Sequence, residues 1–172
     1  MYSWQRCLLL QPMNPHITIR DAWPIDASNI SVLIQGKALY CTANSTEEGA
    51  EYFFSTITPE AIAGYITNPN FIYLLGFVGA ELAGVVASRD GKHLYHLFVA
   101  SKFHRHGIGS ALWAHAKTKA LEGGNTEGFT VNSSLFAVPV YERLGFQIHG
   151  GRVDEKGVVF VPMKLPGSYV RG

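Results

Sequence analysis

The chain has 172 residues, of which 47% are hydrophobic and 16% charged, a balance typical of one globular domain that buries a core without disulfides. Its 14 basic and 13 acidic residues give a net charge of +1, so no chain-wide field favours a nucleic acid or an anionic membrane as a partner. The two cysteines, Cys7 and Cys41, form no Cys-x-x-Cys pattern. We therefore expect neither a disulfide framework nor a zinc–thiolate site, and we expect a cytoplasmic protein.

The first 16 residues contain one apolar run that is too short for a secretory signal or a membrane span. We expect them to form an N-terminal extension that packs on the body or on a second subunit, followed by a single domain over residues 17–172. Residues 17–23 alternate as a strand does, and Pro24 and Asp26 then predict the start of a helix. Periodicity is weaker from 38 to 70, where Thr46 and Thr58 are candidate helix starts.

Three strands are predicted next, over residues 71–77, 82–88 and 93–99, and Asp90-Gly91 is a strong hairpin turn between the last two. The spacing then predicts a helix over 107–121 and a short buried strand at 129–131. A second helix should be capped by Ser133 or Ser134 and carry Pro139 in its first turn. A last hairpin is expected from residues 146–149 and 158–163.

The strongest chemical signal lies in residues 93–112, where a strand leads through a basic loop into a helix opened by Gly107 and Gly109. The first N–H groups of a helix lack intrahelical partners and bind anions. The basic or protonatable side chains just before this helix are Lys102, His104, Arg105 and His106. The pattern indicates a pyrophosphate site, although a plain tight turn is the alternative. Leu112 in place of a third small residue disfavours a dinucleotide fingerprint, and a Gly-Lys-Ser/Thr phosphate loop is missing.

Two motifs in this order resemble the GNAT acetyltransferase superfamily. Residues 103–113, Phe-His-Arg-His-Gly-Ile-Gly-Ser-Ala-Leu-Trp, are similar to the family's coenzyme A loop. Residues 137–146 are similar to its second signature, an Ala four residues before a Tyr that is followed by a Gly-Phe pair. The resemblance covers about residues 17–164 and is weakest over 38–70. It implies an α/β GNAT fold, with a mixed, mostly antiparallel twisted sheet of six to seven strands flanked by about four helices.

The resemblance also implies an N-acetyltransferase that moves an acetyl group from acetyl-CoA to a primary amine by direct attack in a ternary complex. We expect a small-molecule amine as acceptor and no metal, nucleic acid or membrane as partner. Two alternatives stay open, a peptide or protein N-terminal or lysine acetyltransferase and a non-catalytic acyl-CoA-binding sensor module. A homodimer is plausible for the family.

By resemblance, coenzyme A would be held by backbone and side-chain groups of one strand, the glycine loop and the following strand end. These residues are Leu97, Phe98, Val99, His104, Arg105, His106, Gly107, Ile108, Gly109, Ser110, Asn132 and Ser134. The amide of Val99 is the expected polariser of the acetyl carbonyl. Two positions depart from the family pattern, because His104 replaces the usual Gln or Arg and Ser134 the usual Asn.

Tyr141 and His93 are the candidate catalytic residues. Tyr141 occupies the family position of the tyrosine that protonates the coenzyme A thiolate, although a helical tyrosine can also be plain core. His93 falls where relatives carry a glutamate or histidine base, and its ordinary pKa near 6.5 suits that role, although it could simply be exposed. Strand alternation predicts that His93 and His96 point apart, with His96 a structural histidine. Together with His104 and His106 these histidines suggest a metal site, but paired acidic ligands are missing.

The acceptor pocket is expected to be shaped by residues 39–54, which include Tyr40, Tyr52 and Phe53. The carboxylates of this segment, Glu47, Glu48 and Glu51, would suit a cationic small amine.

Overall fold

The computed structural model describes residues 16–167, so the predicted N-terminal extension and Cys7 lie outside the described residues, apart from His16. The strands are β1 (Ile17–Asp21), β2 (Phe71–Val78), β3 (Glu81–Arg89), β4 (His93–Val99), β5 (Gly128–Ser133), β6 (Gln147–Ile148), β7 (Val153–Glu155) and β8 (Val158–Pro166). The helices are η1 (Pro24–Asp26), α1 (Ala27–Gln35), α2 (Ala38–Thr42), α3 (Glu47–Ser55), α4 (Pro59–Thr67), η2 (Ser101–Phe103), α5 (Ile108–Glu122) and α6 (Val138–Arg143).

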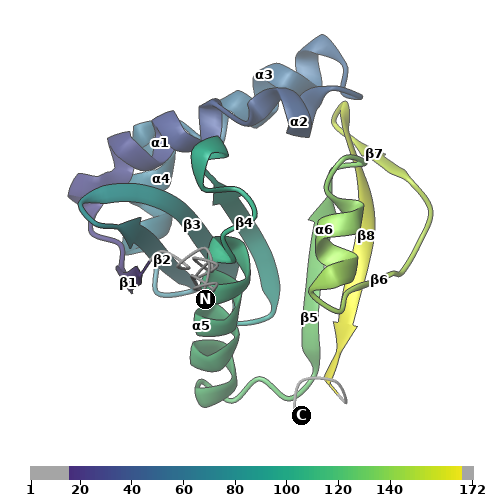
Figure 1. The fold of residues 1–172 in the computed structure, drawn as a ribbon. Coiled ribbons are helices and arrows are strands. Elements are labelled where there is room, and N and C mark those ends of the chain that lie inside the picture. The colour runs from purple at the N-terminus through teal and green to yellow at the C-terminus, as the bar shows by residue number, and fades with distance from the viewer. Residues whose placement is uncertain (1–15, 168–172) are drawn as a thin grey trace, which may run out of the picture.

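The strands form one mixed sheet in the order β1-β2-β3-β4-β5-β8-β6, with β7 paired to β8 (Figure 1). All neighbouring strands are antiparallel except β4 and β5, which are parallel. This confirms the predicted fold class. The sheet has 8 strands instead of six to seven because one further short strand, β7, lies between the two strands of the predicted last hairpin.

The parallel contact between β4 and β5 is short and divides the sheet into two arms. Only His93 with Thr130 and Leu94 with Val131 are paired, at the start of β4 and in the middle of β5. Beyond these pairs β4 stays with β1–β3 and β5 stays with β8, and Figure 1 shows the two arms diverging toward the upper end of the molecule. The fold therefore leaves one edge of β4 without a strand partner from Tyr95 onward.

Helices cover the larger arm on both faces. Helix α5 packs on one face through Ile108, Leu112 and Ala116, and α1 and α4 pack on the other through Ile30, Ile34 and Ile62. The fit of α5 is close at Gly84 of β3, where an added Cβ would lie 2.9 Å from the Phe98 oxygen and 2.9 Å from Leu112. Helix α6 lies beside β5 and β8 (Figure 1), and Val138, Tyr141 and Leu144 pack against the core that α5 shares.

The predicted helix starts are confirmed in two places and wrong in a third. Thr46 and Thr58 are N-caps whose hydroxyls accept from the N–H groups of Gly49 at 3.1 Å and Ala61 at 3.2 Å. The cap of α6 is Ala137, not a serine, because Ser134 forms a separate turn in which its hydroxyl accepts from the Ala137 N–H at 3.3 Å. The sequence also gave no clear signal for the short helix α2.

A β-bulge in β4 makes the predicted alternation of this strand wrong. Ser88 pairs with Leu94 and Ala87 pairs with His96, so Tyr95 is an extra residue without a partner on β3. An extra residue resets which face the following side chains occupy. Leu94 packs in the core under α5, as Leu97 does, whereas Tyr95 belongs to the opposite core. His93 and His96 therefore lie on the same side of the sheet, not on opposite sides.

Candidate active site

A cleft of about 1160 Å³ lies where β4 and β5 diverge. One wall comes from β4 and the first turn of α5, and the other from β5, α6 and β8. Side chains of α2 and α3 complete its lining. The long unpaired edge of β4 thus becomes one side of a cavity large enough for an extended ligand.

The loop before α5 contains residues with left-handed backbone conformation, and the first turn of α5 lines the cleft. Gly107 is the N-cap of α5 with φ 74°, and Arg105 also has a positive φ of 64°. The α5 N-terminus offers free N–H groups there, and the guanidinium of Arg105 adds positive charge. The backbone conformation that the predicted anion site requires is therefore present.

The histidine of this loop has an internal role in the structure. His104 Nε2 donates to the Val99 carbonyl oxygen at 2.9 Å, which fixes its ring against the end of β4. The neighbouring N–H of Ala100 donates to Ala83 on β3 at 2.8 Å, so strand alternation turns the amide of Val99 toward the open edge. His104 thus holds the strand end whose amide was expected to polarise a carbonyl.

The structure brings nearly all predicted site residues to this one cleft. Those that line it are His93, Leu97, Phe98, Val99, His104, Arg105, Gly107, Ile108, Gly109, Ser110, Asn132, Ser134 and Tyr141. The exception is His106, which is exposed and does not line the cleft.

Tyr141 lies on α6 and is half-buried, with its ring in edge contact with Phe146 at 5.8 Å between centroids. Burial raises the pKa of its phenol well above the ordinary value, and the nearby thiol of Cys41 adds to the shift. The hydroxyl therefore keeps its proton at neutral pH and can act as a hydrogen-bond donor inside the cleft.

His93 stands at the junction of the two arms, where its Nδ1 lies 2.8 Å from the Thr130 hydroxyl oxygen. Burial lowers its pKa to about 4, and the positive charge of Arg89 acts in the same direction. The expectation of an ordinary pKa near 6.5 is therefore wrong, and His93 is neutral at pH 7. If Nδ1 donates to Thr130, Nε2 carries the free lone pair that a base needs.

His96 is the structural histidine that we expected. It is 5% exposed, and its Nδ1 lies 3.0 Å from the Tyr73 hydroxyl. Burial lowers its pKa to about 3, so the ring is neutral. The rings of Tyr65, Tyr73, Tyr95 and Phe98 surround it.

Helices α2 and α3, residues 38–55, form a bridging segment between the two arms (Figure 1). Tyr40 stacks on Phe136 of the second arm with ring centroids 4.7 Å apart. The Thr46 N–H donates to the Gly157 oxygen in the β7–β8 turn at 2.9 Å. The bridging segment therefore spans the opening between the two arms.

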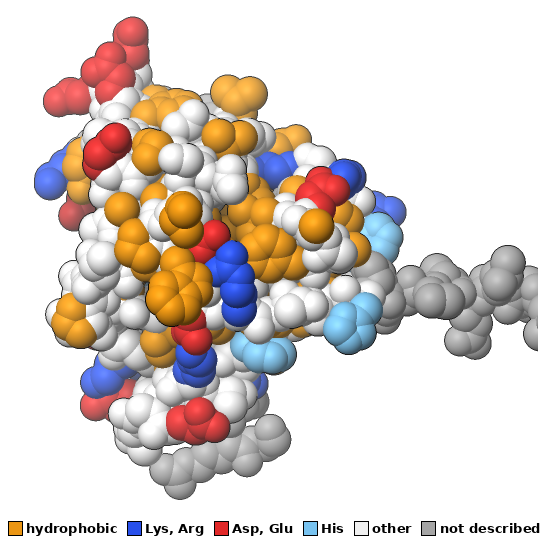
Figure 2. Space-filling model, turned by 90° about the vertical axis from the view of Figure 1, so that its left-hand side faces the viewer, with side chains coloured by type: hydrophobic (Ala, Val, Ile, Leu, Met, Phe, Trp, Pro, Cys, Tyr) orange, Lys and Arg blue, Asp and Glu red, His pale blue; other side chains and the backbone are white. Residues whose placement is uncertain are grey.

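The aromatic residues of this segment line the cleft, whereas the three carboxylates that were expected to face a cationic amine do not. Tyr40, Tyr52 and Phe53 line the cleft. Glu47, Glu48 and Glu51 are exposed and do not line it, because α3 turns them to solvent. Figure 2 shows acidic groups projecting outward from the upper end of the molecule, where α3 lies in Figure 1.

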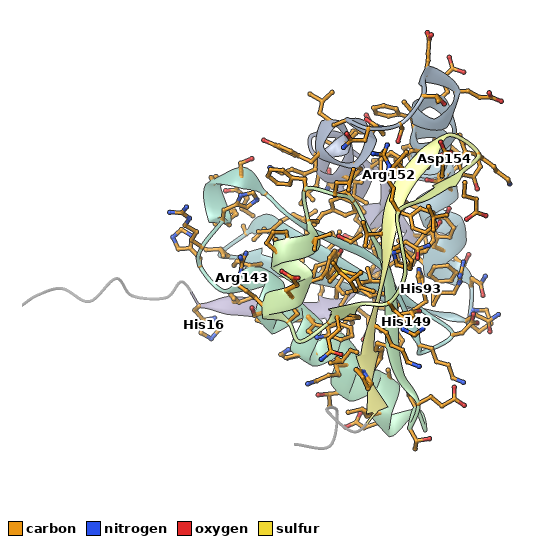
Figure 3. All side chains as sticks on the ribbon, turned by 90° about the vertical axis from the view of Figure 1, so that its right-hand side faces the viewer. His16, His93, Arg143, His149, Arg152 and Asp154 are labelled. Atoms are coloured by element: carbon orange, nitrogen blue, oxygen red, sulfur yellow. The ribbon has the colours of Figure 1, made fainter. Side chains whose placement is uncertain are left out.

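Sequence reasoning missed several cleft residues, namely Lys37, Cys41, Arg89, Arg143 and Lys156. Arg89 and Lys156 each belong to a hairpin turn with left-handed residues, at Asp90-Gly91 and at Lys156-Gly157. Such Asp-Gly and Lys-Gly pairs can be found in a sequence as turns, but which cavity the turn borders depends on the tertiary fold. Figure 3 shows Arg143 on α6 and His93 beside the strands, well separated along the site.

Among residues 16–167, no three His, Cys, Asp or Glu side chains come together as a group that could hold a metal ion. No helix in the same range is both long and apolar enough to cross a membrane. Cys41 is a free thiol, and burial raises its pKa to about 11.

The diverging β4 and β5, with the N-terminus of α5 at the opening between them, form a site of the kind that the two motifs resemble, that of an acyltransferase. A family model described as acetyltransferase (GNAT) domain matches residues 41–166. The chain therefore belongs to the GNAT acetyltransferases and is an acetyl-CoA-dependent enzyme of that family. Among curated protein sequences, none matches the chain significantly.

Solved structures share this fold at low sequence identity. A GCN5-related N-acetyltransferase from Rhodopseudomonas palustris has a TM-score of 0.72 and 16% identity, over 87% of this chain and 94% of that one. The PaiA N-acetyltransferase from Thermoplasma acidophilum, in complex with coenzyme A, has a TM-score of 0.71 and 18% identity, over 87% and 99%. A spermidine N-acetyltransferase from Vibrio cholerae has a TM-score of 0.63 and 16% identity, over 90% and 95%.

Proposed function

We propose that the protein transfers the acetyl group of acetyl-CoA to the primary amine of a small molecule, by direct attack in a ternary complex. The observation that carries the proposal is the cleft between β4 and β5, which contains the α5 N-terminus, the open edge of β4 and Tyr141.

The residues present fit a coenzyme A thioester. Backbone groups of Leu97 and Val99 lie on the edge of β4 that has no strand partner, so they are available to an extended amide-containing arm. The N–H groups of the first turn of α5, together with Arg105, suit a pyrophosphate. Coenzyme A bound to the PaiA relative is consistent with this assignment.

Acetyl-CoA supplies an activated acyl group. The amine nitrogen bonds to the carbonyl carbon, the carbon–sulfur bond breaks, the nitrogen gives up one proton and the sulfur takes one. The Val99 amide is placed to donate to the carbonyl oxygen as negative charge develops on it. Tyr141 is the donor for the sulfur, and its raised pKa keeps its hydroxyl protonated throughout the neutral range.

His93 is the proposed proton acceptor, but its low pKa limits which protons it can accept. An ammonium ion of pKa about 10.4 cannot pass its proton to a histidine of pKa about 4, since the step is uphill by roughly 6 pKa units. We therefore infer that the acceptor enters as the free amine. His93 then takes the proton from the nitrogen after it has bonded to the carbonyl carbon, with Thr130 holding the ring.

The bridging segment supports a small molecule over a protein acceptor. Its contacts at Tyr40 and at Thr46 join the two arms across the cleft, so a folded chain would have to displace them to reach Tyr141. The spermidine N-acetyltransferase with the same fold acts on a small amine by its name, which is consistent with this choice.

The proposal is tested by calorimetric titration with acetyl-CoA, followed by thiol release in the same sample against panels of small amines and peptides. Thiol release with a small amine supports the proposal. Release with peptides alone would show a peptide acetyltransferase, and binding without release across both panels would show a sensor module.

The role of Tyr141 is tested with Tyr141→Phe, which should lower kcat by about tenfold to a hundredfold while the Kd for acetyl-CoA stays unchanged. The control is Tyr65→Phe, because Tyr65 lies outside the cleft lining and also loses a hydroxyl contact, the 3.2 Å bond from Tyr95. Equal kcat values for the Tyr141 variant and the wild type would remove the proton-donor role.

A further inference from the structure

The charged lining of the cleft is strongly unbalanced. Five basic side chains line it, and among the described residues Glu155 is the single carboxylate that does so. The basic residues are Lys37, Arg89, Arg105, Arg143 and Lys156. A cleft of this composition attracts negative charge, and the phosphates of coenzyme A explain only the part of it near the α5 N-terminus.

Arg89 lies at the far end of β4 from the phosphate site. It pairs with His93, the first residue of β4, whereas the loop with Arg105 follows Val99, the last residue. The six residue steps between these ends span about 20 Å at roughly 3.3 Å per residue. Arg89 therefore belongs to the end of the cleft that contains the proposed base, where the acceptor must bind.

Lys156 lines the same cleft, and each of the two cations lies beside an aromatic ring. The Arg89 guanidinium carbon is 5.7 Å from the centroid of the Tyr95 ring, and Lys156 Nζ is 5.1 Å from that of Tyr52. Both rings line the cleft, as the two cations do. We call these four side chains the Arg89–Lys156 cluster, defined as Tyr52, Arg89, Tyr95 and Lys156.

Both cations of the cluster keep donors available for a ligand. The Arg89 Nε to Asp90 carboxylate distance is 3.7 Å, which is beyond hydrogen-bond range, and the Arg89 side chain is 48% exposed. Lys156 makes no ion pair with any residue in the range 16–167. A guanidinium and an ammonium beside two ring faces suit a planar anion attached to an apolar body.

We propose that the acceptor is an amine that also carries an anionic group, of the amino acid type, and that Arg89 and Lys156 bind this anion. The inference rests on the proposed function and names its substrate class. It replaces the cationic amine that the glutamates of α3 suggested, because those carboxylates do not line the cleft. A carboxylate and a phosphate share the required chemistry, and the aromatic rings favour an apolar or aromatic side chain on the acceptor.

Turnover is measured with two matched pairs, phenylalanine with phenylalaninamide and O-phosphoethanolamine with ethanolamine. The enzymes are the wild type, Arg89→Gln, Lys156→Gln and the control Arg152→Gln, whose side chain is exposed and outside the cleft lining (Figure 3). For each enzyme, kcat/KM for the anionic member is divided by kcat/KM for its neutral partner. Comparing this ratio between the wild type and a variant cancels the intrinsic reactivities of the two amines.

Arg89→Gln should lower kcat/KM for the anionic member by about tenfold relative to its neutral partner, and the control should leave that ratio unchanged. A larger fall in the ratio for the phenylalanine pair would identify a carboxylate as the bound anion, and a larger fall for the phosphoethanolamine pair would identify a phosphate. Ratios that stay the same in both Arg89→Gln and Lys156→Gln would overturn the proposal.

Equilibrium binding separates this inference from the proposed function. N-acetyl-phenylalanine and its amide are titrated calorimetrically into the protein saturated with coenzyme A. Tighter binding of the carboxylate, lost in Arg89→Gln, together with no thiol release from any amine would uphold the anion site and refute amine acetylation. Equal binding of the two compounds would refute the anion site even if other amines are acetylated.

Discussion

The contact between α3 and the β7–β8 turn predicts opposite outcomes for one substitution at two helical glycines. Gly49 in α3 and Gly64 in α4 both lie within helices, where replacement by alanine ordinarily stabilises by about 0.5–1 kcal/mol. An added Cβ at Gly64 meets nothing within 4 Å. At Gly49 it would lie 2.1 Å from the backbone oxygen of Gly157.

A backbone oxygen cannot rotate away as a side chain can, so α3 would have to retreat by about 1 Å to restore an ordinary contact. That movement also stretches the 2.9 Å hydrogen bond from Thr46 to Gly157. Overpacking of this kind costs about 1–3 kcal/mol, which exceeds the gain in helix propensity. Gly64→Ala should therefore raise the Tm by about 2–4 °C, and Gly49→Ala should lower it by a similar or larger amount.

The assay is thermal unfolding of both variants and the wild type at constant pH, with the acceptor KM and the acetyl-CoA Kd measured on the same preparations. Because α3 contributes Tyr52 and Phe53 to the cleft lining, and Tyr52 belongs to the Arg89–Lys156 cluster, Gly49→Ala should raise the acceptor KM and leave the cofactor Kd unchanged. If Gly49→Ala proves as stable as Gly64→Ala, the close packing of the bridging segment against the turn is refuted.

Three further predictions concern other parts of the molecule. Burial lowers the pKa of His96 to about 3 in the native chain. Between about pH 6.5 and 3 the unfolded chain therefore binds a proton at this residue that the native chain does not bind, so the free energy of unfolding falls on acidification. Urea unfolding should show a loss of about 1.5 kcal/mol from this residue between pH 6.5 and 5, and His96→Gln should lack that loss. Gly84→Ala should destabilise by about 1–3 kcal/mol, since its Cβ would meet the Phe98 oxygen at 2.9 Å, and an unchanged urea midpoint would contradict the packing of α5 on β3. The thiol of Cys41, with a pKa of about 11, should react with iodoacetamide at pH 7.5 about a hundredfold more slowly than free cysteine, and peptide mass spectrometry with bound coenzyme A should show still slower labelling.

The sequence predicts those features of the fold and site that depend on a few adjacent residues. The α5 start at Gly107, the hairpin turn at Asp90-Gly91 and the caps at Thr46 and Thr58 depend on a few adjacent residues, and the structure has them where expected. The two spaced motifs also placed Tyr141 beside the same cleft as the glycine loop.

The errors arise where distant segments meet. The bulge at Tyr95 depends on how β3 and β4 pair, and no residue pattern within β4 marks it. The direction of the glutamates on α3 depends on the contact between Gly49 and Gly157, which are more than a hundred residues apart in the sequence. The low pKa of His93 follows from its position between the two arms, which only the tertiary fold determines.

The bulge at Tyr95 also means that β4 can lose one residue at this point without exchanging its two faces. Tyr95 is the extra residue opposite β3, so its deletion would leave Leu94 and His96 as direct neighbours, opposite Ser88 and Ala87 as they are now. Leu94 would stay in the core under α5, and His93 would keep its place at the junction of the two arms. What the deletion removes is the Tyr95 ring, which lines the cleft. Among related chains, a difference of one residue in length before Leu97 would therefore mark a different acceptor site on an unchanged core.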